Sequence, residues 1–348
     1  MDRPAEINIG YTITHVQVAT DADAACAARG KGAAVSGQDA LIAHYNDPQV
    51  RGAAIDDLGD LRRAGASVVR TVFWVSQAAD VSLNKSASPR GPLARMIARN
   101  GILPEQYPKN LARFAADVQQ AGYKLLVVVF GNQGRSAPHC RSAGRWGECY
   151  DPAYDARTWS AMAEMIRAVK TESLPRLRVV FDIAGEYCFA NKPKMLVERN
   201  AEHYVRYMTA RYHETFGDHN YIVSCLAGAH QAALAEAAIP YSAAFLSRLS
   251  PKPAFFDLHV YLNSPAPIEQ VLVAADAAAR RLGVPLIIGE TFANNVVLFD
   301  VIKHMRAANR LDSLQDILVW PLRMGSKCSI DLKPTGVLNW VLPAFPQP

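Results

Sequence analysis

The sequence has no long hydrophobic run. No stretch of the 348 residues approaches the roughly 20 consecutive apolar residues that a membrane-spanning helix needs. The first residues, MDRPAEINIG, lack the apolar core of a signal peptide. We therefore expect no membrane span. We expect either a secreted or periplasmic protein in its mature form or, as the alternative, a cytoplasmic protein.

The sequence also lacks an excess of charge of one sign. The chain has 37 Lys and Arg against 32 Asp and Glu, a net charge of +5, and no basic run is longer than a pair. Domains that bind nucleic acid usually gather their basic residues in a stripe or carry a known motif. We therefore expect no nucleic-acid partner. Separately, we expect the chain to be a monomer.

Cysteine is scarce, and the six cysteines show no spacing typical of metal ligands. Cys140 and Cys149 lie nine residues apart in a loop-like segment. They would fit a disulfide in an oxidising compartment or two free thiols, and the sequence leaves both open. The turn after the first apolar run, YTITHVQVATD at 11–21, has no glycines of the kind that bind phosphate. We predict neither a metal nor a cofactor.

What the chain does contain is a regular alternation of two patterns. Short apolar runs rich in β-branched residues occur at 6–13, 67–74, 124–131, 177–185, 220–225, 255–262, 285–292 and 316–322. Between most of them lie segments with apolar residues at helical spacing, at 50–65, 111–122, 158–170, 201–217, 268–283 and 296–310. Strands that are apolar throughout and alternate with helices are typical of a parallel sheet covered on both faces.

Eight such strands predict a single (β/α)₈ TIM barrel that spans residues 1–348. A doubly wound open sheet is the rival architecture, and the missing glycine-rich loop disfavours it. The connections at 14–48, 75–107 and 132–155 are long and rich in small residues. Long connections in a compact domain are usually functional or disordered, so we expect these three to form walls beside the active face of the barrel.

Polar and aromatic residues gather near the carboxyl ends of the predicted strands, where barrel enzymes carry their active sites. This set contains Arg70, Trp74, Asn132, Glu186, His230, His259, Tyr261, Glu290 and Trp320. The other ends of the strands carry no comparable set. The pattern therefore predicts one active site at the carboxyl end of the barrel.

The fourth strand, in VVFDIAGEYCF at 179–189, carries two carboxylates that the alternation of a strand places on one face, Asp182 and Glu186. We expect Asp182 inside the barrel, where burial requires a hydrogen bond or a cation such as Arg70. Glu186 and Glu290, at the ends of two strands, could converge above the barrel. Two carboxylates about 5 Å apart are the machinery of retaining glycoside hydrolysis, and Arg70 is the candidate cation that keeps the nucleophile ionised.

These segments resemble the clan-A retaining glycoside hydrolases, especially the cellulase-like family 5. VVFDIAGEYCF resembles the segment that carries the acid/base, and the resemblance implies that role for Glu186. PLIIGETF resembles the nucleophile segment, which implies that role for Glu290. The remaining segments imply that Arg70 supports the nucleophile, that His259 and Tyr261 of DLHVYLN line the site, and that Trp320 lies under a sugar. The resemblance covers residues 6–324 and implies a β-linked oligosaccharide or polysaccharide as substrate, such as a cell-wall glucan or mannan or a bacterial exopolysaccharide.

The chain departs from this family at three points. Gly185 replaces the Asn that usually precedes the acid/base, Tyr187 replaces a frequent Pro, and FGNQG at 130–134 lacks a histidine common there. The first departure puts the identity of the sugar in doubt. It also motivates an alternative of another class, a glycan-binding TIM barrel without turnover. A lyase or isomerase is disfavoured because no lysine ends any of the eight strands.

Overall fold

The computed structural model describes residues 6–13, 15–16, 39–42, 44–76, 95–97, 103–131, 152–185, 199–224, 232–320 and 345. Its centre is a parallel sheet whose main path has eight strands in the order β8-β7-β6-β4-β1-β11-β10-β9. In chain order these strands are β1 (Asn8–Ile13), β4 (Val68–Ser76), β6 (Leu125–Gly131), β7 (Arg178–Gly185), β8 (Tyr221–Ile222), β9 (Phe256–Val260), β10 (Leu286–Phe292) and β11 (Leu314–Trp320).

The sheet curls into a nearly closed barrel. Its path ends at β8 and β9, and a backbone hydrogen bond from Ala254 N to Tyr221 O, 2.7 Å long, joins the segments on the two sides of this seam. Three short strands lie in the connections after the first two barrel strands. β2 (His15–Val16) pairs with β3 (Asp39–Ala40), and β5 (Arg95–Ile97) pairs with the end of β4.

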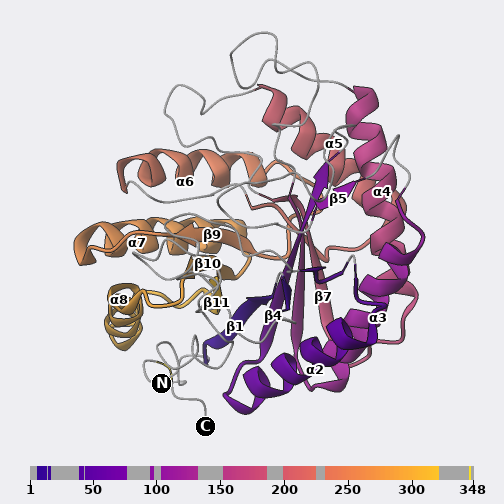
Figure 1. Cartoon of the computed structure of the whole chain (residues 1–348). Helices are drawn as coiled ribbons and strands as arrows, with labels where there is room; N and C mark the ends of the chain where they lie inside the picture. Colours follow the sequence, from indigo (N-terminus) through magenta and orange to yellow (C-terminus); the bar gives the residue numbers. More distant parts are fainter. Residues whose placement is uncertain are drawn as a thin grey trace, which may run out of the picture.

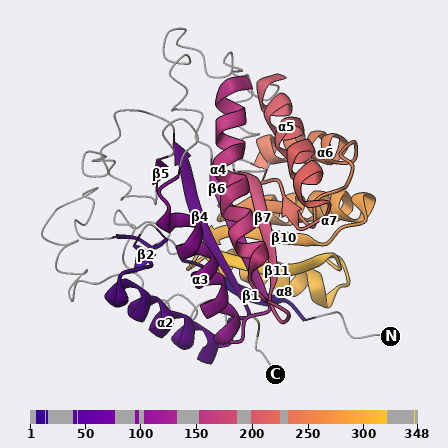
Figure 2. The ribbon, with the colours of Figure 1, turned by 90° about the vertical axis from the view of Figure 1, so that its right-hand side faces the viewer.

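Seven helices of the described residues surround the strands, with α2 to α5 on one side and α6 to α8 on the other (Figure 1). The quarter turn in Figure 2 shows α3 and α4 in front of β6 and β7. The helices are α2 (Pro48–Arg63), α3 (Gln106–Gln120), α4 (Pro152–Thr171), α5 (Arg199–Phe216), α6 (Ala232–Leu246), α7 (Pro265–Leu282) and α8 (Val296–Ala307).

Helix ends follow the local sequence. Asp47 caps α2 by accepting a 2.8 Å hydrogen bond from Gln49 N, and α7 ends at Gly283 in the left-handed conformation, φ 71°, which a residue without a β-carbon adopts at little cost.

Each barrel strand places alternate residues in two different apolar layers. Val127 and Val129 of β6 belong to a cluster inside the barrel, whereas Leu126 and Val128 pack in the larger cluster between the strands and the helices. Burial on both faces explains why these strands are apolar at nearly every position. Inside the barrel, the apolar cluster gives way to the buried polar side chains Arg70, Asp182, Ser224, Asp257, His259 and Glu290.

The eight predicted strands and the (β/α)₈ class are confirmed, and the rival open sheet is wrong. The six predicted helices are present, but the sequence analysis did not include α6. This helix has Ala, Leu, Ile and Phe around most of its circumference and Pro240 within it, so it has no polar face to reveal a helical period. The walls expected from the long connections fall mostly outside the described residues.

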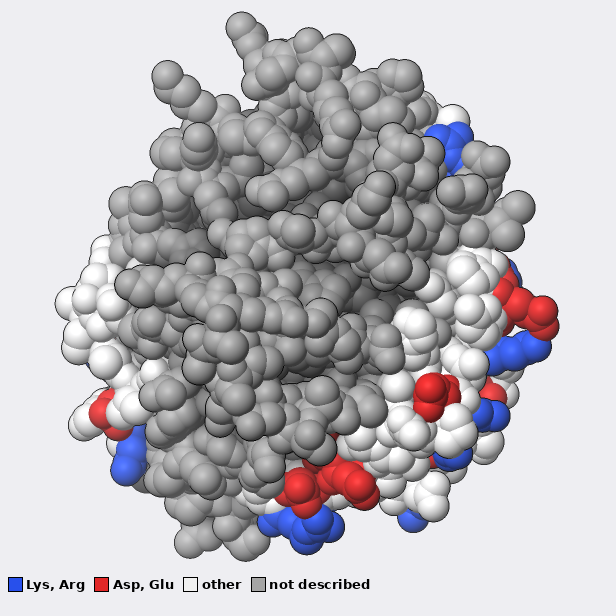
Figure 3. Space-filling model, viewed as in Figure 1, with Lys and Arg blue, Asp and Glu red and all other residues white. Residues whose placement is uncertain are grey.

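The described part of the chain contains no helix that is both long enough and apolar enough to cross a membrane. On the face seen in Figure 3, the Lys and Arg of the described residues lie beside Asp and Glu, and the two signs are mixed along the lower and right-hand margins.

Candidate active site

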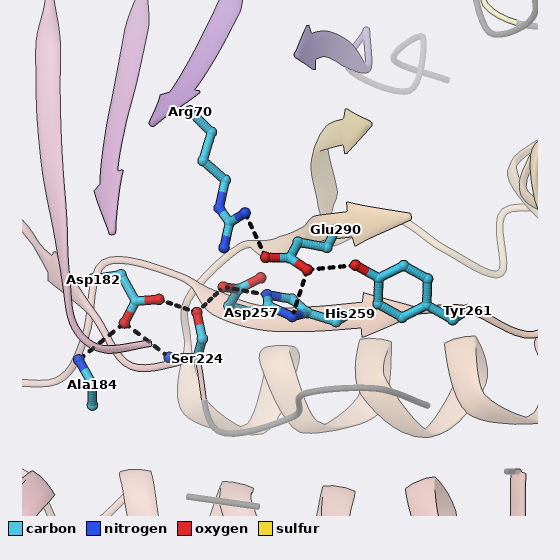
Figure 4. A network of polar contacts seen from close by, with 8 residues as sticks. All are labelled: Arg70, Asp182, Ala184, Ser224, Asp257, His259, Tyr261 and Glu290. Carbon is cyan, nitrogen blue, oxygen red and sulfur yellow. Dashed lines mark hydrogen bonds and ion pairs between the residues drawn. The ribbon is translucent and has the colours of Figure 1, made fainter. Parts of the chain in front are cut away.

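The candidate site is centred on an ion pair that crosses the inside of the barrel. Arg70 of β4 and Glu290 of β10 approach with Nη1 and Oε1 2.5 Å apart (Figure 4). Two strands, β1 and β11, separate β4 from β10 around the sheet. The two side chains therefore meet across the interior. Arg70 is only 1% exposed and Glu290 only 7%, so the pair is far less screened than a surface ion pair.

A β-bulge in β10 directs Glu290 into this space. The register between β9 and β10 shifts, because Ile288 pairs with Leu258 and Glu290 pairs with His259, the next residue of β9. Gly289 also faces inward, since a β-carbon built on it would lie 2.2 Å from Asp257 Oδ1. Two successive residues thus face the interior, which strict alternation forbids and a bulge allows.

Two side chains from β9 and the turn after it contact the other oxygen of Glu290. The Tyr261 hydroxyl donates a hydrogen bond of 2.5 Å to Oε2, and His259 Nδ1 lies 3.5 Å from the same oxygen. The aromatic ring of Tyr261 is held edge-on to Phe292, with 4.9 Å between ring centroids. Both oxygens of Glu290 are therefore oriented, one by Arg70 and one by the Tyr261 hydroxyl.

Trp320 ends β11 beside this pair. The guanidinium carbon of Arg70 lies 5.7 Å from the centroid of the indole ring, within the range of a cation–π contact. Trp320 is partly exposed and packs against the apolar cluster inside the barrel. It therefore borders the candidate site.

A second group of polar residues joins the site through His259. His259 Nε2 lies 3.6 Å from Asp257 Oδ2, and the Ser224 hydroxyl lies 2.5 Å from that same oxygen. Ser224 also makes a short hydroxyl contact with Asp182 Oδ2. Asp182 Oδ1 accepts from the backbone N–H groups of Ala184 and Ser224, each at 3.2 Å. Figure 4 shows these side chains as one chain of contacts that leads to Glu290.

The two aspartates of this group differ in their pKa values. Burial and the nearby charge of Asp257 raise the pKa of Asp182 from 3.8 to about 6, against the opposing effects of Ser224 and Arg70. Burial also acts to raise the pKa of Asp257, but His259, Arg70 and the Ser224 hydrogen bond outweigh it, and this pKa is lowered. Asp182 is therefore the carboxyl group of the two that holds a proton more readily.

The guanidinium of Arg70 responds to the same charges. Burial acts to lower the pKa of Arg70, but the combined charges of Glu290, Asp257 and Asp182 raise it. Arg70 is therefore a permanent cation in the barrel interior.

Five of the predicted site residues come together in the structure: Arg70, His259, Tyr261, Glu290 and Trp320. The expected contact between Arg70 and Glu290 is present. Asp182 lies inside the barrel with hydrogen-bond partners, as predicted. Trp74 lies on β4, where its backbone is paired with Arg95 and Gly131.

Several predicted residues lie outside the described residues. They are Asn132, Glu186, His230 and the cysteines Cys140 and Cys149. The convergence of Glu186 with Glu290 and the choice between a disulfide and two thiols therefore stay predictions.

Sequence analysis missed Asp257, Ser224 and Gly289. For Asp257 a signal existed, because Asp257, His259 and Tyr261 recur at every second position and so share one face of a strand. Ser224 carried no local signal, since its role depends on the seam between β8 and β9. Among the residues that the structure describes, no group of three or more His, Cys, Asp or Glu side chains is arranged to hold a metal ion.

No family model and no curated protein sequence matches the chain. Solved structures do match it. The chain superposes on the exo-β-1,4-mannosidase Op5Man5 from Opitutaceae bacterium strain TAV5 with a TM-score of 0.60 and 14% identity, over 97% of this chain and 59% of that one. The chain thus spans less than two thirds of the length of that mannosidase.

Two further structures match most of both chains. A GH5-4 broad specificity endoglucanase from Clostridium longisporum gives a TM-score of 0.57 at 10% identity, over 98% of this chain and 96% of that one. A modular endo-β-1,4-mannanase from Cellulomonas fimi, of glycoside hydrolase family 26, gives 0.56 at 10% identity, over 99% and 72%. The chain therefore shares the (β/α)₈ fold of these three structures.

Proposed function

We propose that the protein is a retaining glycoside hydrolase that cleaves β-linked oligosaccharides or polysaccharides, with Glu290 as the nucleophile. The observation that carries the proposal is the environment of Glu290. This carboxylate is buried at the end of a barrel strand, paired with Arg70 at 2.5 Å and hydrogen-bonded by Tyr261 at 2.5 Å. Catalytic residues of TIM barrels occupy this position, and glycosidases of this type need an ionised, oriented carboxylate.

In the proposed reaction, a Glu290 oxygen attacks the anomeric carbon and forms a glycosyl ester while the bond to the leaving oxygen breaks. Glu186 donates a proton to that oxygen. Glu186 then accepts a proton from water as the water attacks the ester, which releases the sugar with its original anomeric configuration. Arg70 and Tyr261 orient the two oxygens of Glu290 before attack and after release. Trp320, at the end of β11, offers an apolar face on which a sugar ring could stack.

The proposed substrate class is supported by the names of proteins that share the fold. The three structures compared above bear the names of an exo-β-1,4-mannosidase, an endoglucanase and an endo-β-1,4-mannanase. We propose a β-linked glucan or mannan, or a bacterial exopolysaccharide, and a secreted or periplasmic monomer that acts on it. Trp74, Asn132 and His230 complete the proposed substrate-binding set.

The first test is hydrolysis of aryl β-glycosides, β-glucans and β-mannans by the wild type, with the anomer released followed by NMR. We expect the β-anomer as first product. The Glu290→Ala variant should fold and lose turnover, and azide should restore release of the aryl group as an α-glycosyl azide. Glu269→Ala is the matched control, because Glu269 also pairs with an arginine, Arg310 at 2.6 Å, but on an exposed surface. Normal turnover by Glu290→Ala would refute the assignment.

The Glu186 role has a separate test. Glu186→Ala should lose most activity on natural glycosides but retain more on aryl glycosides whose leaving groups need no proton. Equal losses on both substrates would argue against a proton donor. Gly185, where the family has Asn, favours the second candidate, a glycan-binding barrel without turnover. Glycan binding by a wild type that hydrolyses no member of the panel would support that candidate.

A further inference from the structure

The Ser224 hydroxyl lies between two buried carboxyl groups. Its oxygen is 2.5 Å from Asp257 Oδ2 and also within hydrogen-bond contact of Asp182 Oδ2. A serine hydroxyl has one proton to donate, and an ionised carboxylate only accepts. Two ionised aspartates would therefore leave one of these contacts without a proton. One carboxyl group must donate to the hydroxyl oxygen for both contacts to be hydrogen bonds.

We propose that Asp182 and Asp257 hold one proton between them through the Ser224 hydroxyl. The proton resides on Asp182 Oδ2, which donates a hydrogen bond to the Ser224 hydroxyl oxygen. The hydroxyl in turn donates its own hydrogen bond to Asp257 Oδ2. The arrangement keeps Asp257 ionised, and Asp257 is thereby a positioning residue for His259 and, through it, for Glu290.

The partners of each oxygen assign the proton to Asp182. Asp182 Oδ1 accepts two backbone N–H groups, so Oδ2 is the oxygen left to carry a proton. Asp257 Oδ2 faces His259 Nε2 at 3.6 Å as well as Ser224, and both contacts favour an ionised acceptor. The opposite pKa shifts of the two aspartates agree with this assignment.

Charge balance gives the same answer. Arg70 interacts with three carboxyl groups, those of Glu290, Asp257 and Asp182. Arg70 and the three carboxyl groups, counted alone and all ionised, carry a net charge of 1 − 3 = −2, and one shared proton brings this to −1. Burial makes every uncompensated charge costly. In the described part of the chain, the charged or titratable groups that face the two aspartates are Arg70 on β4 and His259 on β9, with Glu290 on β10 beyond them. The neighbouring strand β6 contributes the apolar side chains of Val127 and Val129 to the interior cluster.

Asp257 acts on Glu290 through His259, its neighbour on the same face of β9. The ionised Asp257 attracts one ring nitrogen of His259, and the other ring nitrogen faces Glu290 Oε2 at 3.5 Å. Gly289 leaves the space that the Asp257 carboxyl group occupies, since a β-carbon there would lie 2.2 Å from Oδ1. The same bulge that brings Glu290 inward therefore also admits the carboxylate that orients its neighbour.

The test is an infrared pH titration of the full chain with isotope-labelled aspartate, which follows the C=O band of each protonated carboxyl group. Asp316 supplies the matched control, because it is another buried aspartate inside the barrel with a pKa raised to about 6, mainly by burial, and it is bonded to Asn8. We expect two bands that titrate near pH 6. Asp182→Asn should remove one band and Asp316→Asn the other.

The sharing of the proton is tested by substituting Asp257 and following the Asp182 band. Asp257→Asn should lower the midpoint of the Asp182 band by about 1–3 pH units, because a neighbouring negative charge is lost, and Asp316→Asn should leave that midpoint unchanged. If Asp257→Asn does not fold, Ser224→Ala should shift the frequency of the Asp182 band, because the acid loses its acceptor. An Asp182 band that keeps its midpoint in Asp257→Asn, or its frequency in Ser224→Ala, overturns the proposal.

The positioning role rests on the proposed function and has its own measurement. The pH profile of kcat/KM should lose its inflection near the Asp182 midpoint in Asp182→Asn and keep it in Asp316→Asn. The same inflection in wild type and Asp182→Asn would overturn the positioning role. Because the infrared bands need no substrate, a protein that hydrolyses no glycan yet shows the shared proton would refute the proposed function alone.

Discussion

Asp316 gives a sharp prediction about stability and pH. It lies on β11 in the interior of the barrel, is only 2% exposed, and accepts a 3.0 Å hydrogen bond from Asn8 Nδ2. Burial raises its pKa from 3.8 to about 6, although Asn8 and Arg178 oppose the shift. Asp316→Asn removes the titrating group and keeps an oxygen that can accept from Asn8.

The sign follows from proton binding. The folded protein keeps the Asp316 proton up to about pH 6, whereas the unfolded chain releases it near pH 3.8. The contribution to the free energy of unfolding is therefore fully present below the unfolded pKa and is lost as the pH rises through the folded pKa. A difference of about 2.2 pKa units corresponds to a total loss of about 3 kcal/mol.

The assay is urea denaturation of wild type and Asp316→Asn at a series of pH values. The free energy of unfolding of the wild type, minus that of the variant, should fall by roughly 2–2.5 kcal/mol between about pH 4 and about pH 8. Every other titrating group, Asp182 included, cancels in this difference. Two stability curves that stay parallel across this range would refute the reasoning.

Two further substitutions probe the environment of Glu290. Tyr261→Phe keeps the ring contact but removes a hydrogen bond to a carboxylate, so kcat/KM should fall about 10- to 100-fold. Tyr241→Phe, at a Tyr–Glu contact between α5 and α6, should leave kcat/KM unchanged, and equal effects of the two would contradict the role of Tyr261. Gly289→Ala drives a β-carbon into Asp257 and should lower the free energy of unfolding by about 1–3 kcal/mol. An unchanged urea midpoint would show that the carboxylate moves freely.

The barrel was predictable because its strands have a distinctive sequence pattern. A strand buried on both faces is apolar at nearly every position, and the short, valine-rich run of β6, LLVVVFG, is typical of such a strand. Helix α6 was not predicted, because a helix that is apolar on most sides shows no helical period in its sequence. One boundary moved by two residues, because the last strand was predicted to begin at 316 and begins at Leu314.

The site was predictable only where alternation holds. Asp182 faces inward as the period of a strand requires, and so do Asp257 and His259. The register of β7 against β6 shifts between Asp182 and Gly185. The count that placed Glu186 on the same face as Asp182 therefore crosses an irregularity. Ser224 was beyond sequence reasoning, because its partners come from other strands and are fixed by the closure of the barrel.

Glu290 shows most plainly why sequence order alone could not build this site. Ile287 faces the interior cluster and Ile288 the outer one, so alternation points Gly289 inward and Glu290 outward. The bulge reverses the second assignment. Both residues then need room inside the barrel, and the space at position 289 already holds the Asp257 carboxyl group. Only a residue without a β-carbon satisfies both demands. The position of the Asp257 carboxyl group therefore requires a glycine at position 289.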